Sequence, residues 1–116
     1  MSRKPEITIE EMLKAVHGIE RIVSTATYEV YVADWTALPA VQRGIEIISE
    51  ASRRLPSDLT AGHPDIPWHQ IHSIGNILRH EYHGIVDEVI WEIAKRSLPP
   101  LKAALTQMLS ELDQSP

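Results

Sequence analysis

Apolar residues recur every three to four positions along most of this 116-residue chain, which is the spacing of one face of an α-helix. The first such stripe is made of Ile9, Met12, Leu13, Val16, Ile19, Ile22 and Val23. Thr8 and Glu11 have the spacing of a capping box, so we expect Thr8 to begin this helix. Residues 27–34 are predicted to form a short helix, because a lone strand would have no partner.

The same periodicity continues over residues 38–55, 67–82 and 88–96, and in a last stripe of Leu101, Leu105, Met108, Leu109 and Leu112. Asp87 is the expected N-cap of the helix over 88–96. Pro99 and Pro100 are expected to break the helical pattern, because proline lacks a backbone N–H. The pattern predicts an all-α fold, an up-and-down bundle of four main helices plus short helices, in one domain over residues 1–116.

Composition narrows the classes of function. The net charge of −5 argues against broad, non-specific binding of nucleic acid, so any action on RNA must depend on local charge. Cysteine is absent, which fits a reducing cytoplasm and excludes disulfides and thiolate metal sites. The sequence shows no pattern of a signal peptide and no apolar run of about 20 residues for a membrane span. All three tryptophans, Trp35, Trp68 and Trp91, are expected to pack within the protein, and stacking on bases is the alternative role.

The predicted helix over residues 67–82 carries the most unusual polar surface. On a helical wheel its core side would hold Ile71, Ile74, Leu78 and, beyond the helix, Ile85. An arc of about 100° on another side would hold His69, His72, Asn76, Arg79, His80 and His83. Four of the six histidines in the chain therefore fall on one predicted stripe.

The residues alone leave three interpretations of this arc open. It could be an ordinary solvated face. It could bind a divalent metal through His69 and His72, or through His80 and His83, although no carboxylate shares the arc. It could act on phosphate, with His80 moving a proton near neutral pH and Arg79 holding negative charge.

The predicted helix over residues 38–55 presents a second charged set. Arg43, Glu46 and Glu50 share one face, where they could simply pair with one another along the helix. If that face turns towards the polar arc, a carboxylate near His80 could orient the imidazole instead. The sequence does not decide between these arrangements.

Several segments, taken in order, carry a resemblance to a known family. They are Ala40–Ala51, Leu55-Pro56, His63–Trp68, Asn76–Tyr82, Ile90–Ile93 and Leu98–Leu101. Their order and spacing resemble the HepT-like ribonuclease toxins of the HEPN superfamily, over roughly residues 9 to 110. The resemblance implies an all-α bundle that forms a homodimer, with a nuclease cleft near the dimer interface. It also implies a toxin–antitoxin pair with a minimal nucleotidyltransferase antitoxin as the partner.

The active motif of that family is an arginine, four to six residues, a histidine, one residue and a tyrosine. His80 and Tyr82 match it here. The resemblance implies that His80 acts in RNA cleavage and that Tyr82 is a site at which the partner attaches AMP. On an ideal helix these two side chains point in nearly opposite directions, so either the helix distorts near Gly84 or Tyr82 acts from the edge of the cleft.

The arginine of the motif is missing. Its position falls at residues 73 to 75, which here are Ser73, Ile74 and Gly75. Arg79 lies one turn after Gly75, and its long side chain could cover a displacement of about 6 Å along the helix axis. The alternative is that nuclease competence has been lost and that Arg79 pairs with Glu50 or Glu81.

The leading prediction is an endoribonuclease toxin that needs neither metal nor cofactor. His80 would be the acid or base, Arg79 the cation, and Asn76 a hydrogen-bond donor to phosphate or a support for the imidazole. The possible supporting residues are Arg43, Glu46, Glu50 and His83. The alternative prediction is a catalytically weak helical module that binds a nucleotidyltransferase or a nucleotide.

Overall fold

The computed structural model describes residues 4–80 and 85–114, with side chains omitted for residues 85 and 86. These ranges hold the helices α1 (Pro5–Val23), α2 (Tyr28–Ala33), α3 (Ala37–Ser52), α4 (Ser57–Ala61), α5 (Trp68–His80), α6 (Ile85–Glu92) and α7 (Leu98–Asp113), and a π-helix η1 (Ile93–Ser97). The described residues contain no strand, which confirms the all-α prediction. No described helix combines the length and apolarity that a membrane crossing needs.

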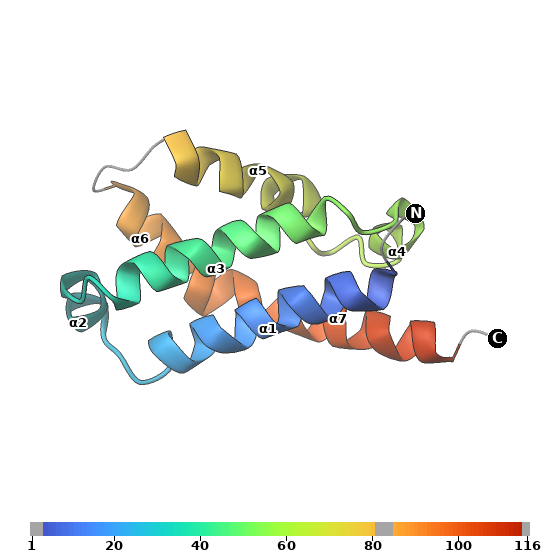
Figure 1. The fold of residues 1–116 in the computed structure, drawn as a ribbon, viewed down its shortest axis with the longest axis horizontal. Helices are drawn as coiled ribbons and strands as arrows, with labels where there is room; N and C mark the ends of the chain where they lie inside the picture. Colours follow the sequence, from blue (N-terminus) through green and yellow to red (C-terminus); the bar gives the residue numbers. More distant parts are fainter. Residues whose placement is uncertain (1–3, 81–84, 115–116) are drawn as a thin grey trace.

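The long helices lie side by side (Figure 1). α1 packs between α3 and α7, and α5 packs on α3 from the other side. Their buried faces form one apolar core, with Ile9, Met12, Val16, Val41, Ile90, Leu105 and Met108 fully enclosed. The predicted periodicity of α1, α3 and α7 therefore corresponds to real core faces, while α5 contributes only Gly75 and Leu78 as buried residues.

The predicted capping box at the start of α1 is wrong. The helix begins at Pro5 with Lys4 as N-cap, so Thr8 lies within the first turns and is buried. Its hydroxyl has no hydrogen-bond partner within the described part of the chain. Proline favours the first helical position because its φ angle already fits the helix and the missing N–H would be unpaired there anyway. The helix therefore starts three residues before the predicted cap.

The predicted break at Pro99 and Pro100 is also wrong. α6, η1 and α7 follow one another without a loop, and the two prolines lie in the first turn of α7. Neither proline can donate to a carbonyl four residues earlier. The preceding residues adopt a π-helix, and the Leu98 N–H donates to the Ile93 carbonyl, so hydrogen bonding continues past the prolines. Asp87 is no N-cap either, because α6 already begins at Ile85.

The three tryptophans behave differently from one another. The Trp91 ring packs 4.9 Å from that of Tyr31, and the Trp68 indole donates to the His63 carbonyl at 3.0 Å. Trp35 is 81% exposed, so its predicted packing role is wrong. Asp34 accepts hydrogen bonds from the Thr36 and Ala37 backbone N–H groups, and these bonds fix the turn that holds Trp35 outside the core. The Thr36 hydroxyl also donates to the Asp34 carboxylate, and this bond is the largest cause of the lowered pKa of that carboxyl. The two backbone N–H groups lower the pKa further.

Candidate functional site

The contact between α3 and α5 sets the position of every candidate residue on α5. Gly75 is buried there, and its N–H donates to the Ser49 hydroxyl at 3.0 Å. The same hydroxyl donates to the His72 carbonyl at 3.2 Å. A Cβ atom on Gly75 would lie 2.8 Å from the Ser49 Oγ and 3.1 Å from its Cβ, so the two helices can approach this closely only with glycine at position 75.

This contact gives a physical reason for the missing arginine. An arginine at position 75 would have to displace Ser49 and push α5 away from α3. Ile74 packs against the apolar core, and the Ser73 hydroxyl donates to the His69 carbonyl at 2.9 Å. Two of the three positions at which the family arginine was expected, Ile74 and Gly75, therefore serve the packing of α5, whereas Ser73 bonds within its own helix.

Arg79 lines a cleft of about 360 Å³ between α1, α3 and α5. The residues that line this cleft are Glu11, Arg43, Glu46, Ile47, Glu50, Arg54 and Arg79. The structure thus brings Arg79 together with Arg43, Glu46 and Glu50, as expected if the charged face of α3 turns towards α5. Three lining residues were not among the predicted site residues: Glu11, which was expected to cap a helix, Ile47 and Arg54.

The charges in the cleft are partly paired. Arg54 lies 2.9 Å from the Glu11 carboxylate and 3.8 Å from that of Glu50, and Arg43 lies 3.7 Å from Glu46. The Arg79 guanidinium donates to the Asn76 side-chain carbonyl at 3.1 Å, and no carboxylate of residues 4–80 or 85–114 forms an ion pair with it. Asn76 is a neutral amide, so this hydrogen bond does not neutralise the Arg79 guanidinium. The alternative pairing with Glu50 is not found, and Glu81, the other suggested partner, lies outside the described residues.

His80 is the last residue of α5 and is exposed. It follows Arg79 directly but does not line the cleft, and no carboxylate among the described residues is hydrogen-bonded to its ring. The suggested orientation of His80 by Glu46 or Glu50 is therefore absent from this structure. Tyr82 and His83 lie outside the described residues.

The predicted histidine arc divides between two surfaces. His72 is half-buried towards α3, and its carbonyl accepts two hydrogen bonds from the Arg53 guanidinium, at 3.0 and 2.7 Å. His69 is exposed on the other side of α5. The described residues contain no group of three or more histidine, aspartate or glutamate side chains that could hold a metal ion.

A larger apolar groove of about 640 Å³ separates α5 from α6, η1 and α7. Its apolar lining includes Ile66, Ile71, Ile74, Ile77, Val89 and Leu98. Ile77 is 49% exposed and Val89 45% exposed. α5 thus lies between two different surfaces, a charged cleft towards α3 and an apolar groove towards α6 and α7.

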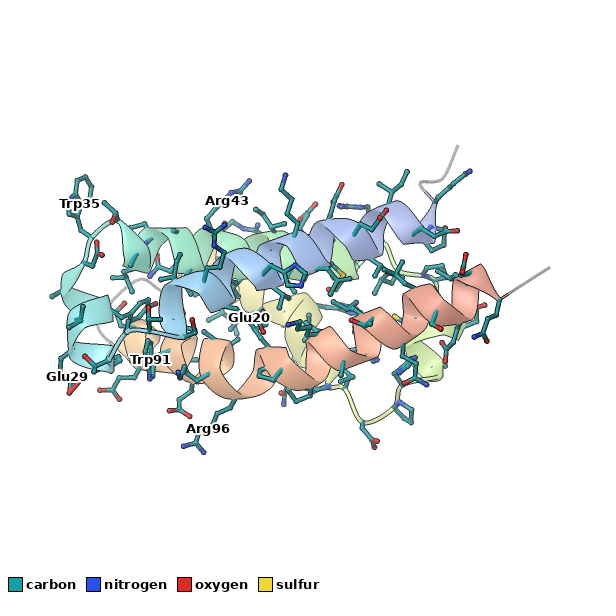
Figure 2. The ribbon with its side chains drawn as sticks, turned by 90° about the horizontal axis from the view of Figure 1, so that it is seen from below. Glu20, Glu29, Trp35, Arg43, Trp91 and Arg96 are labelled. Carbon is teal, nitrogen blue, oxygen red and sulfur yellow. The ribbon has the colours of Figure 1, made fainter. Side chains whose placement is uncertain are left out.

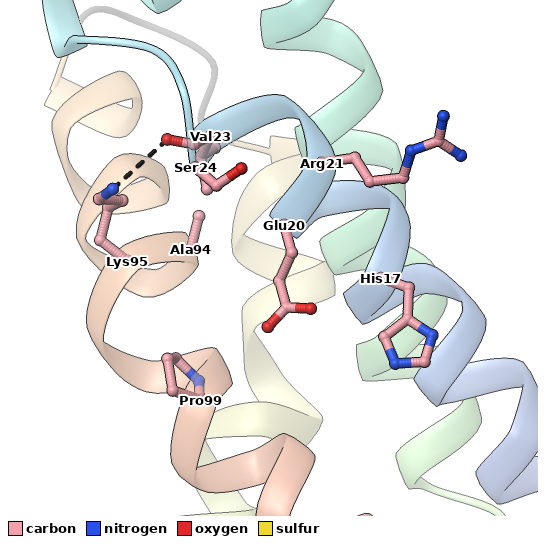
Figure 3. Close-up of a pocket in the computed structure, with 8 residues that line it drawn as sticks. All are labelled: His17, Glu20, Arg21, Val23, Ser24, Ala94, Lys95 and Pro99. Carbon is pink, nitrogen blue, oxygen red and sulfur yellow. Dashed lines mark hydrogen bonds between the residues drawn. The ribbon is translucent and has the colours of Figure 1, made fainter.

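A third hollow, of about 530 Å³, lies between the end of α1 and η1 (Figure 3). The Lys95 ammonium donates to the Val23 carbonyl at 3.3 Å, which satisfies one of the unpaired carbonyl groups at the end of α1. Lys102 pairs with Glu20 at 3.1 Å. These two lysines have structural partners, whereas Arg21 projects from α1 into the open (Figure 3).

Comparison with known proteins assigns the chain to a family. The family described as Ribonuclease HepT-like matches residues 12–108. The chain therefore belongs to the HepT-like ribonuclease family, which confirms the resemblance drawn from the sequence.

Individual relatives agree with this assignment. The protein named "Probable ribonuclease HepT" of Thermococcus cleftensis is 32% identical over 108 residues, which cover 93% of this chain and 98% of that protein. A protein of Caldanaerobacter subterraneus subsp. tengcongensis, named "Putative RNase", is 28% identical over 109 residues, covering 94% and 97%. The "Gamma-glutamylcyclotransferase and putative RNase" of Methanocaldococcus jannaschii is 29% identical over 115 residues, and the chain spans 52% of its length. No solved structure matches the chain significantly.

Proposed function

We propose that this protein is an endoribonuclease toxin that cleaves RNA without a metal ion, with Arg79 and His80 as its catalytic residues. The observation that carries the proposal is the state of Arg79. Its guanidinium lines a cleft, is steadied by the Asn76 amide, and has no carboxylate partner among the described residues. Arginine suits a phosphate site because its planar fork of N–H groups matches phosphate oxygens and stays charged.

The chemistry needs no external nucleophile. The 2′-hydroxyl of RNA attacks the adjacent phosphorus, the bond to the 5′ oxygen breaks, and the products are a 2′,3′-cyclic phosphate and a 5′-hydroxyl. His80 removes the proton from the 2′-hydroxyl or returns one to the leaving oxygen, and Arg79 stabilises the added negative charge on phosphate. Arg43, which is 71% exposed at the same cleft, would hold a neighbouring phosphate, with Glu46 limiting its movement.

The test compares wild type with His80→Ala and Arg79→Ala in an assay that measures cleavage of a synthetic RNA. The assay buffer contains a metal chelator. We expect each substitution to slow cleavage roughly 100- to 1,000-fold, since each removes one transition-state interaction. Arg96→Ala is the matched control, because Arg96 is exposed and pairs with Glu92 one turn away. Equal rates for wild type and His80→Ala would overturn the proposal, and restoration of lost activity by added metal would overturn metal independence.

We also propose that a minimal nucleotidyltransferase silences the toxin by attaching AMP to Tyr82, as the family resemblance implies. Tyr82 is two residues from His80 in the chain. We expect a nucleotide on its hydroxyl to obstruct the RNA from the edge of the cleft. The absence of cysteine fits the reducing cytoplasm in which such a pair would act. Incubation with the partner and ATP should add one adenylyl group, found by mass spectrometry on the peptide that contains Tyr82, and Tyr82→Phe should abolish it. Modification of the phenylalanine variant would rule out this site.

A homodimer is the third part of the proposal. A second copy of the chain would cover the apolar groove, where Ile77 and Val89 expose large aliphatic side chains beside the helix that carries His80. Ile77→Asp should shift the sedimentation of the protein from dimer to monomer. Val30→Asp is the matched control, because Val30 is 63% exposed on α2 and does not line the groove. A monomeric wild type, or a dimer unaffected by Ile77→Asp, would contradict the proposal.

The replacement of the motif arginine by Gly75 favours a second candidate, a weakly catalytic module that binds the nucleotidyltransferase. Substituting arginine at position 75 cannot separate the two functions, because that side chain would collide with Ser49. Wild type itself separates them. A module would bind the partner in a pull-down yet leave the test RNA intact at high enzyme concentration.

A further inference from the structure

The exposed side of α1 carries a set of residues that the nuclease site does not use. Lys14, His17 and Arg21 are all exposed and follow one another at intervals of three and four residues. On a helix these positions fall within about 60° of one another. Gly18 lies among them, and we refer to Lys14, His17, Gly18 and Arg21 as the basic stripe.

Gly18 has no packing reason in this structure. A Cβ atom there would meet no described atom within 4 Å, whereas a Cβ on Gly44 or Gly75 would collide with a neighbouring helix. Glycine inside a helix destabilises the fold relative to alanine. What it offers in return is a bare backbone that a ligand can approach closely. Gly18 lies between Lys14 and Arg21 along α1, which points to a ligand with negative charge.

The charges of the basic stripe are available. Within residues 4–80 and 85–114, neither Lys14 nor Arg21 forms an ion pair, whereas Arg43, Arg54, Arg96 and Lys102 each do. Two hollows, of about 560 and 530 Å³, flank the stripe, and His17 and Arg21 line both. Their acidic residues are Glu10 and Glu20, and Lys102 neutralises the second of these. The stripe is thus locally cationic in a chain of net charge −5.

The basic stripe adjoins the cleft that holds Arg79. Glu11 lines that cleft and lies on α1, three residues before Lys14. Gly18 follows Glu11 by seven residues, or about two helical turns, so the two residues lie on the same surface of α1. Figure 2 shows Arg43 projecting outward beside α1, on the side of the molecule opposite to Arg96. A strand that leaves the cleft over Arg43 therefore reaches α1 without crossing to another face.

We propose that the basic stripe binds the sugar–phosphate backbone of the RNA substrate, away from the scissile bond. This inference rests on the proposed ribonuclease function. Lys14 and Arg21 contact phosphates, and Gly18 lets the backbone of the strand lie directly on the helix. Such contacts carry no sequence information, and they position the strand so that one phosphodiester reaches Arg79. They also supply the local attraction that an acidic protein needs in order to hold RNA.

The experiment measures binding of a fluorescent single-stranded RNA to the full chain carrying His80→Ala, over a series of salt concentrations. Adding Lys14→Ala and Arg21→Ala should weaken binding on the order of 25-fold at about 0.1 M salt, and should reduce the slope of log affinity against log salt by about 1.4. Adding Arg96→Ala instead should change neither quantity. Wild-type protein is assayed for cleavage in parallel.

Gly18→Ala separates binding from folding, because the two effects have opposite signs. Alanine should raise the melting temperature and yet weaken RNA binding. A higher melting temperature of Gly18→Ala with unchanged affinity for RNA would overturn the proposal. The proposal would also be overturned if the Lys14→Ala, Arg21→Ala variant bound RNA like its parent but bound a protein partner more weakly. If wild type fails to cleave RNA but binding still depends on Lys14 and Arg21, the stripe is supported and the proposed cleavage is not.

Discussion

The two faces of α3 meet their neighbours in different ways. Towards α1, Gly44 faces the end of the Ile19 side chain, which a Cβ atom would approach to 2.8 Å. Towards α5, Gly75 faces the Ser49 hydroxyl and is hydrogen-bonded to it. The first contact is apolar and flexible, whereas the second is directional. The comparison indicates that the α1–α3 contact stabilises the fold and that the α3–α5 contact positions the candidate catalytic helix.

Burial supports this division. α1 contributes six buried residues to the protein interior, including Met12 and Val16 with no exposed surface. α5 contributes two. Since burial of apolar surface is the dominant stabilising contribution, most of the free energy of unfolding is expected to come from α1, α3 and α7. Substitutions on the two faces of α3 should therefore affect different measurements.

The largest change in stability is expected for Met12→Ala, on the α1 side. It opens a cavity in the core and should lower the free energy of unfolding by about 2–5 kcal/mol, measured by urea denaturation. RNA cleavage per folded molecule should remain unchanged. Ile7→Ala is the control on the same helix, because Ile7 is exposed. A loss of specific activity in folded Met12→Ala would contradict the division.

Gly75→Ala should cost less stability, about 1–3 kcal/mol, but more activity, because its Cβ pushes α5 away from Ser49. Gly44→Ala comes within 3 Å only of Ile19 side-chain atoms, on the α1 side, and should keep its activity. Adding Ser49→Gly to Gly75→Ala removes the colliding atoms and should restore part of the cleavage rate. Similar rates for the two alanine variants would show that α5 is not positioned by this contact.

Ser49→Ala removes the hydroxyl that joins Gly75 to His72 and should lower the free energy of unfolding by about 1 kcal/mol. Ser52→Ala is the matched control, since its hydroxyl donates to the Ser49 carbonyl within α3. Both variants should lose a similar amount of stability in denaturation. Only Ser49→Ala should slow RNA cleavage, and an equal effect of the two on cleavage would argue against a positioning role.

The smallest effect is expected for Arg54→Ala, which breaks the partly exposed ion pair between Arg54, two residues after the end of α3, and Glu11 on α1. The loss should be about 0.2–1 kcal/mol and should shrink as salt screens the pair. Denaturation at low and high salt measures the loss in free energy of unfolding and its dependence on salt. A loss that does not change with salt would mean that packing of the arginine stem, rather than charge, joins the helices there.

Much of the fold could be predicted from the spacing of apolar residues, because a buried helix face repeats along the chain itself. The exceptions have local causes. Pro5 extends α1 beyond the cap suggested by Thr8, and a π-helix lets the chain continue through Pro99. Trp35 was expected inside because it is large and apolar, yet the turn capped by Asp34 leaves it in solvent.

The candidate site was predictable only in part. The helical wheel placed Arg43, Glu46 and Glu50 on one face, but only the structure shows that this face meets Arg79. The wheel could not show that His72 faces α3, or that Gly75 is excluded from carrying a side chain by Ser49, 26 residues away. Both facts depend on how closely two helices approach, which is a property of the pair and not of either segment.

Because α5 packs mainly on α3 and borders a groove on its other side, it can detach without exposing most of the core. Its amide protons should therefore exchange with solvent at a lower opening free energy than those of α1. Cleavage would then fail at a denaturant concentration that still preserves the helical circular dichroism signal. Inactivation and unfolding would become separate events, with the candidate catalytic helix as the first part of the bundle to be lost.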